Sequence, residues 1–156
     1  EKYLICNRCG VAIKFYNMFI FFLNLVPLGL IPYVGWIANG INPGEVSVRV
    51  ACGLLPNTEK IRDKSASIQF FYPTKNVTAN KVTIDQNKLP KGIYETQILA
   101  SPRQKLILPP HDHVSCRYAY AIAVTDNPSQ SKTIAKNAVK AYMLDTAPVL
   151  NEEIHV

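Results

Sequence analysis

Charge is scarce in this sequence, and the scarcity is local. Charged residues make up 18% of the 156 residues, whereas about 25% is typical of soluble domains. No Asp, Glu, Lys or Arg occurs between Phe15 and Ala38, although charged residues return at ordinary density from Glu45 onward. A chain of this length accommodates one domain, or a short membrane element with a domain of about 100 residues. The sequence thus predicts an apolar segment in residues 1–40 and a β-rich domain in residues 45–156.

The sequence also lacks a recognisable catalytic motif. It has no phosphate-binding loop, no Ser-His-Asp order and no paired carboxylates, and its 11 acidic residues lie in neither a His-rich nor a Gly-rich setting. Acid–base catalysis therefore has no evident centre, and we expect a protein that is not an enzyme. The net charge of +6 comes from dispersed Lys and Arg residues, which favours attraction to acidic surfaces and argues against a nucleic-acid partner.

The uncharged segment from Phe15 to Ala38 is long enough for a transmembrane helix. At ~1.5 Å per helical residue it can span the ~30 Å hydrocarbon core of a membrane. Arg8 and Lys14 precede it, which would keep the N-terminus in the cytoplasm and place the β-rich domain on the extracytoplasmic side. Membrane contact is expected for five aromatic residues of the segment: Phe15, Phe19, Phe22, Tyr33 and Trp36.

Helix-breaking residues interrupt this segment. Pro27 and Pro32, together with Gly29 and Gly35, favour a kinked or re-entrant helix over a straight one. The alternative is a pair of buried core elements that the rest of the chain or partner subunits cover. Lipid or protein is therefore expected to shield the segment from water in both cases.

Period-2 alternation of apolar side chains marks the β-rich domain. Six strands are predicted, at residues 46–52, 66–72, 81–85, 93–99, 105–108 and 114–125. In the last of these, Ala119, Ala121 and Ala123 occupy the alternate positions, which predicts close packing on that face as well. Short strands separated by Pro and Gly favour a mainly β fold, an antiparallel β-sandwich or small barrel. Residues 149–156 are either an edge strand or a tail.

One short helix is predicted near the C-terminus. Lys132, Lys136 and Lys140 recur at every fourth residue, which is helical spacing, and Asn127 with Pro128 supplies a helix start. The three lysines either contact an anionic surface, such as lipid headgroups, or form the solvated face of the helix.

Four cysteines offer a metal site and a disulfide. Cys6 and Cys9 have the C-x-x-C spacing that binds Zn²⁺ from a tight turn, but no second pair completes the site. They are half of a metal site completed elsewhere, a redox pair or ordinary thiols. Cys52 and Cys116 both fall on inward-facing strand positions. They are predicted either to form a disulfide, which would stabilise the fold by about 4 kcal/mol, or to be buried free thiols.

Two further short motifs are candidates for ligand binding or modification. His111 and His113, close to Cys116, offer ligands for Zn²⁺ or copper. Because Pro109 and Pro110 precede these histidines, a solvated turn is the alternative. Asn76 begins an N-x-T triplet in a polar loop and is a candidate for N-glycosylation.

Three functions fit these observations. The leading hypothesis is a membrane-associated structural or assembly subunit that binds other protein subunits within an oligomer, since the chain has much packing surface and no catalytic centre. The second is a membrane-inserting, pore-forming protein in which the Pro and Gly breaks act as hinges. The third is a metal-binding or redox protein that uses Cys6 and Cys9, or His111 and His113.

Overall fold

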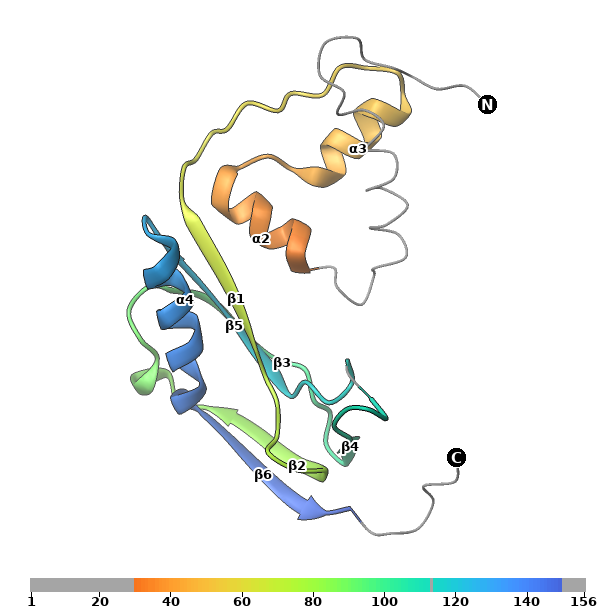
Figure 1. The fold of residues 1–156 in the computed structure, drawn as a ribbon, viewed down its shortest axis with the longest axis vertical. Helices are drawn as coiled ribbons and strands as arrows, with labels where there is room; N and C mark the ends of the chain where they lie inside the picture. Colours follow the sequence, from red (N-terminus) through yellow and green to blue (C-terminus); the bar gives the residue numbers. More distant parts are fainter. Residues whose placement is uncertain (1–29, 113, 150–156) are drawn as a thin grey trace. The chain divides into compact units, whose positions relative to one another are not determined.

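The structure, a computed structural model, describes residues 30–112 and 114–149. The chain divides into two compact units, residues 1–61 and residues 62–156. The first unit contains the helices α2 (Leu30–Asn39) and α3 (Pro43–Ala51), and the strands all belong to the second unit (Figure 1).

Helix α3 begins where the local sequence provides a complete N-terminal cap. The Asn42 side-chain oxygen accepts hydrogen bonds from the backbone N–H groups of Gly44 (2.9 Å) and Glu45 (3.3 Å). Pro43 occupies the first turn, where its missing N–H and fixed φ suit a helix start. These contacts satisfy N–H groups that would otherwise lack partners.

The strand predicted at residues 46–52 is therefore wrong, because these residues form most of α3 and its C-cap. The alternation of Val46, Val48 and Val50 looks like a strand, yet only Val46 is buried and Val48 is 64% exposed. The cap at Asn42 and Pro43 determines the local structure, and in a helix residues two positions apart face different directions.

The predicted transmembrane helix is contradicted within the described residues. In residues 30–112 and 114–149 no helix is long and apolar enough to cross a membrane. Helix α2 has ten residues, which is about 15 Å of helix. It ends at Asn39, and the next residue, Gly40, has a left-handed φ of 81° and donates its N–H to Trp36 O (2.8 Å). Residues 15–29 of the predicted segment lie outside the described residues.

The second unit contains two three-stranded antiparallel sheets. The first has the order β1-β5-β3, and the second has the order β4-β2-β6. Their strands are β1 (Ser65–Phe71), β2 (Val77–Ile84), β3 (Ile93–Ile98), β4 (Gln104–Leu106), β5 (Ala119–Thr125) and β6 (Tyr142–Pro148). Short 3-10 helices, η2 (Gln86–Lys88) and η3 (Ala138–Ala141), and the helix α4 (Pro128–Asn137) complete the described part of this unit.

The fold is thus mixed α/β and contains no barrel among the described residues, which corrects the predicted mainly β sandwich or barrel. The predictions of antiparallel strands and of one C-terminal helix are confirmed. Residues 114–118 of the predicted last strand are not part of β5, and β6 was not predicted. The sequence of β6, with Asp145, Thr146 and Pro148, shows no clear alternation.

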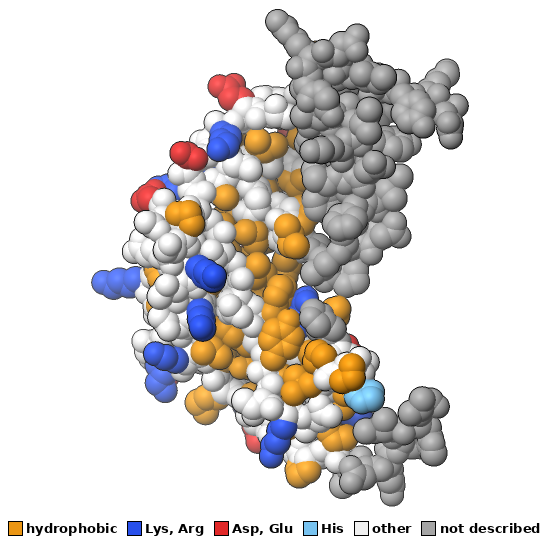
Figure 2. Space-filling model, in the orientation of Figure 1, with side chains coloured by type: hydrophobic (Ala, Val, Ile, Leu, Met, Phe, Trp, Pro, Cys, Tyr) orange, Lys and Arg blue, Asp and Glu red, His pale blue; other side chains and the backbone are white. Residues whose placement is uncertain are grey.

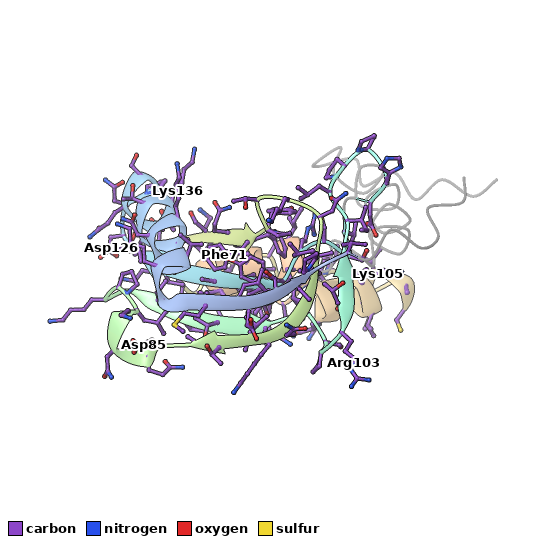
Figure 3. The ribbon with its side chains drawn as sticks, turned by 90° about the horizontal axis from the view of Figure 1, so that it is seen from below. Phe71, Asp85, Arg103, Lys105, Asp126 and Lys136 are labelled. Carbon is purple, nitrogen blue, oxygen red and sulfur yellow. The ribbon has the colours of Figure 1, made fainter. Side chains whose placement is uncertain are left out.

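Small side chains let α4 and η3 pack closely on the first sheet. Ala119, Ala121 and Ala123 are 0% exposed, and α4 contacts both β1 and β5, which confirms the close packing predicted for this face. The Ser67 and Ser131 hydroxyls lie 2.7 Å apart across this interface. The buried cluster joins both sheets, and Figure 3 shows Phe71 inside the unit and Lys136 on the outside of α4.

Asn127 is expected to contribute measurably to the stability of the second unit. Its side-chain oxygen caps α4 by accepting the N–H groups of Ser129 (2.8 Å) and Gln130 (3.3 Å). Asn127→Ala should lower the free energy of unfolding by about 1 kcal/mol, as measured by urea denaturation. Asn137, which forms no side-chain cap bond at the end of α4, is the matched control. An equal loss in Asn137→Ala would contradict the capping role.

Candidate functional site

A polar pocket lies in the first unit, between α3 and the extended segment at residues 57–61. Its volume is about 280 Å³. Backbone of the Gly40 turn forms part of its wall, and six polar side chains line it: Asn42, Glu45, Arg49, Asn57, Glu59 and Lys60. The pocket thus combines two carboxylates, two cations and two amides.

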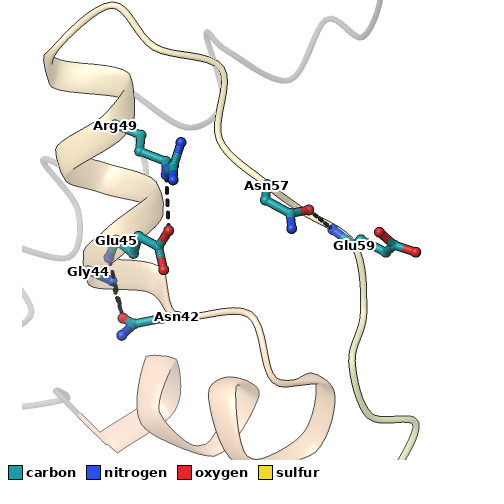
Figure 4. Close-up of polar contacts among 6 residues, drawn as sticks. All are labelled: Asn42, Gly44, Glu45, Arg49, Asn57 and Glu59. Atoms are coloured by element: carbon teal, nitrogen blue, oxygen red, sulfur yellow. Dashed lines mark hydrogen bonds and ion pairs between the residues drawn. The ribbon is translucent and has the colours of Figure 1, made fainter.

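Local hydrogen bonds hold several of these side chains in place (Figure 4). Arg49 Nε donates to Glu45 Oε1 at 3.0 Å, one helical turn apart on α3. Asn57 Oδ1 accepts the N–H of Glu59 at 2.9 Å. Since the Asn42 oxygen already caps α3, the first N–H groups of this helix are not available for an anion. Binding in the pocket must therefore come from the side chains.

The balance of charge in this pocket suits a small ligand that carries charges of both signs. Because Glu45 and Arg49 pair in an exposed position, their bond contributes at most about 0.5 kcal/mol to stability. A ligand can therefore replace either partner at little energetic cost. The sequence did not indicate this pocket, because residues 46–52 were predicted to form a strand. The pocket also depends on a contact between distant residues, in which the Ile61 N–H donates to Asn39 O at 3.0 Å.

The residues proposed for metal binding are not brought together in the part of the chain that the structure covers. There, no group of three or more His, Cys, Asp and Glu side chains could hold a metal. His111 is exposed in a turn. Asp112 beside it accepts the N–H groups of Val114 (3.1 Å) and Ser115 (3.2 Å) and so shapes the loop. Cys6, Cys9 and His113 lie outside the described residues, so a site that uses them stays a prediction.

The predicted disulfide is contradicted, because Cys52 and Cys116 are both free thiols. Cys52 is exposed and ends α3 in the first unit, so it does not occupy the inward strand position that the sequence suggested. Cys116 is buried in the second unit. Burial raises the pKa of the Cys116 thiol, and the charge of Asp112 raises it further. The thiol therefore stays protonated at neutral pH and is a weak nucleophile.

Other candidate residues lie on the surface. Tyr33 and Trp36 are in α2 with ring centroids 6.1 Å apart, and Trp36 is 38% exposed. Phe15, Phe19 and Phe22 lie outside the described residues. Asn76 is exposed, and its side-chain oxygen accepts the Leu108 N–H at 2.9 Å. Membrane contact and glycosylation at these positions stay predictions.

The lysine row on α4 and η3 is exposed as the helical spacing indicated. Lys132, Lys136 and Lys140 form no ion pair with any of the described residues, and separate Lys and Arg side chains mark this side in Figure 2. Contact between η2 and η3 brings Lys88 toward the same end, although Lys88 pairs with Asp85 at 3.1 Å. An anionic partner for the row stays a prediction.

Sequence reasoning did not identify a row of aromatic and charged side chains on the first sheet. Phe70 lies opposite Tyr120, and Tyr120 lies opposite Gln97, so the three share one face. The Phe70 and Tyr120 rings meet edge to face, with centroids 5.9 Å apart. At one end, the Arg117 guanidinium lies 4.2 Å from the centroid of the Phe70 ring. This arrangement depends on strand register, which the sequence pattern alone does not define.

The other end of the row is an acidic hydrogen-bonded group. The Tyr120 hydroxyl lies 2.6 Å from side-chain oxygens of Glu95 and Gln97. A phenol has one proton to donate, so we assign that proton to Glu95 and orient the Gln97 amide so that its nitrogen donates to Tyr120. Tyr120 is buried, with 2% exposure, so its hydroxyl has a fixed position. The hydrogen bond from this hydroxyl holds the Glu95 carboxylate beside the strand.

Tyr142 is expected to make the second unit sensitive to alkaline pH. Its hydroxyl donates to Tyr120 O at 2.7 Å, and burial raises the pKa of Tyr142 to about 12, against about 10 in an unfolded chain. Its contribution to stability is therefore complete below pH 10 and is lost as the pH rises from 10 to 12. In urea denaturation across this range, Tyr142→Phe should show a smaller decline than the unsubstituted chain. Tyr94→Phe, at an exposed position, should show the full decline.

Comparison with known proteins defines the fold only. No family model and no curated protein sequence matches the chain. Among solved structures, the chain is similar to the crystal structure of phosphoribosylglycinamide synthetase from Anaerococcus prevotii, with a TM-score of 0.59 and 10% sequence identity. The match covers 76% of this chain and 30% of that chain. The matched share is larger than either unit, so it includes residues of both.

Proposed function

We propose that this chain works as a binding part of a larger protein assembly and is not a self-contained catalyst. The observation that carries the proposal is the exposed apolar surface at the C-terminal end of α3. Val48, Leu54 and Leu55 are 64%, 57% and 84% exposed. The Leu54 N–H donates to Arg49 O at 2.8 Å, which keeps the leucines at the helix end. We name these three residues the α3 patch.

Exposed apolar side chains this close together along the chain favour a protein partner. Single exposed apolar residues are common on any surface, whereas clusters are typical of interfaces. The structural comparison supports the same idea, because the similar fold forms 30% of a longer enzyme chain.

Sedimentation velocity tests the assembly. The full chain, prepared under native conditions from its source, should sediment as a species larger than its own 17.4 kDa. Val48→Ser together with Leu55→Ser should shift it to the mass of the single chain. Met143→Ser is the matched control, since Met143 is 62% exposed in the second unit. A single-chain mass for the unsubstituted protein, or identical behaviour of all variants, would refute the proposal.

The membrane-associated and pore-forming roles depend on residues 15–29, which lie outside the described residues. Both therefore stay predictions, and neither is needed for the assembly proposed here.

A second candidate function is the binding of a small polar ligand in the α3 pocket. The pocket and the structural similarity to a synthetase support it together. Arg49 and Lys60 would hold an anionic group, and Glu45 and Glu59 would hold an amine. The name of the similar enzyme suggests two probes, ribose 5-phosphate and glycine.

Isothermal titration calorimetry can decide this second candidate. Saturable binding of either probe is expected, and Arg49→Ala should weaken the binding of ribose 5-phosphate by about tenfold or more. Lys75→Ala, at an exposed position in the turn between β1 and β2, should leave binding unchanged. If neither probe binds at millimolar concentration, the pocket has no such function.

A further inference from the structure

We propose that Arg117 forms the anion-binding end of a second ligand site, on the first sheet, for a small carboxylate with an apolar body. The site is independent of the α3 pocket, because Arg117, Phe70 and Tyr72 all belong to the second unit.

Arg117 is a buried cation that pairs with no acidic side chain in residues 30–112 and 114–149. The residue is only 6% exposed. Nε donates to the Tyr72 hydroxyl at 3.0 Å, and no carboxylate of the described residues forms an ion pair with it. Buried charges are normally paired with an opposite charge, because removing an ion from water is costly. The described part of the fold thus holds a positive charge and supplies no carboxylate to pair with it.

The aromatic rings beside Arg117 offset only part of this cost. The guanidinium carbon is 4.2 Å from the Phe70 centroid and 6.0 Å from the Tyr72 centroid. A cation over a ring face is attracted to it, but this attraction is smaller than the desolvation penalty of a buried ion. Asp112, the acidic residue of the same loop, is held by the N–H groups of Val114 and Ser115 instead. The site is therefore favourable for an anion from outside.

The terminal nitrogens of Arg117 are available to such an anion. No fully buried side-chain nitrogen or oxygen of the described residues lacks a hydrogen-bond partner. The two terminal nitrogens donate to none of these residues, so they must reach the solvent. Stacking on Phe70 and the bond to Tyr72 keep the guanidinium plane in one orientation. A planar fork held in this way matches the two oxygens of a carboxylate and loses little freedom on binding.

Partly exposed apolar residues that are joined to Arg117 or to its neighbour Tyr118 indicate the body of the ligand. Tyr72, Leu99 and Val114 are each between 38% and 43% exposed. The Leu99 N–H donates to Tyr118 O at 2.9 Å, and the Arg117 N–H donates to Val114 O at 3.3 Å. Both residues are thus tied by backbone bonds to the segment that carries Arg117. An aromatic or aliphatic carboxylate would combine the ion pair with apolar contact, as small-molecule sites commonly do.

Nuclear magnetic resonance of the full chain tests the proposal without any substitution. The Arg117 Nε–Hε signal should shift saturably when benzoate is added, and acetate should bind about tenfold more weakly because it lacks the apolar body. Sodium chloride at equal ionic strength is the control. No saturable shift with benzoate, or the same shift with chloride, would overturn the site. Equal affinities for acetate and benzoate would contradict the proposed apolar contact between the ligand and the site.

Two variants add an independent measurement. Arg117→Lys keeps the charge but loses the planar fork, so benzoate affinity should fall by about tenfold or more while the folded spectrum is retained. Arg103→Lys, at an exposed position, should bind benzoate as the unsubstituted chain does. Unchanged affinity in folded Arg117→Lys would contradict the role of Arg117. If that variant does not fold, the titration of the Nε–Hε signal in the unsubstituted chain decides.

Discussion

Leu106→Ala is expected to lower the free energy of unfolding by about 2–5 kcal/mol, the range for removing a fully buried leucine side chain. Leu106 is 0% exposed and belongs to the cluster that joins both sheets. It lies opposite Val77 in a strand of only three residues, β4. Because little backbone pairing holds β4, the side chain of Leu106 supplies much of its attachment. The truncation should therefore leave a cavity and loosen the edge of the second sheet.

Urea denaturation of Leu106→Ala and Met143→Ala provides a comparison within the second unit. Both variants shorten a long apolar side chain to alanine, but Met143 is 62% exposed, so its truncation should change stability by less than about 0.5 kcal/mol. A loss below about 1 kcal/mol for Leu106→Ala would mean that β4 is not packed as the structure describes.

Ala121→Leu is expected to destabilise the second unit by about 1–3 kcal/mol or more, because the larger side chain has no space. Ala121 is 0% exposed in the centre of the first sheet. It belongs to one buried cluster with Ala138 and Ala141 of η3. A leucine here must push the helical layer away from the sheet. This prediction tests whether the small alanine side chains of β5 are needed for α4 and η3 to pack closely on the first sheet.

Thermal unfolding followed by circular dichroism measures this effect. Ala51→Leu is the matched control, because Ala51 is exposed at the end of α3 and a leucine there meets no packed neighbour. A stable Ala121→Leu variant with an unchanged midpoint would show that the face beside β5 has free space.

Part of the fold could be predicted because the signals are local. Asn127 and Pro128 start α4 by the capping contacts that the sequence suggested. The strands β1 and β3 match their predicted ranges within about one residue. The alanine positions of β5 correctly indicated packing on two sides. Each of these signals depends on residues that lie close together in the sequence.

The errors have identifiable physical causes. Valine occupies every second position from Val46 to Val50, which resembles a strand pattern. The helix cap at Asn42 outweighs this pattern, so the segment forms α3. The disulfide prediction was wrong for the same reason, because it assumed that Cys52 lies on the inward face of that strand. Cys52 instead follows α3 and is exposed. Strand β6 was missed because its pairing with β2 comes from tertiary contact and not from alternation.

The candidate sites were harder to predict than the elements. The α3 pocket depends on the return of residues 57–61 to α3 and to Asn39. The Arg117 site depends on the register of β1 against β5 and on the path of the loop before β5. Neither can be recognised from spacing in the sequence. Conversely, the motifs that spacing did highlight, such as His111 and Asp112, form a turn held by local hydrogen bonds.

By itself, the sequence determined where α4 begins and which segments prefer extended structure. It also determined that one face of β5 carries only small side chains. These features could be predicted because capping, turn and alternation signals act over a few residues. Only the tertiary structure decided that the strands form two separate sheets, that Cys52 is exposed as a free thiol, and that Arg117 is buried against Phe70. These outcomes depend on which distant segments pack together, and the free energy of that packing is spread over many contacts that no short stretch of sequence contains.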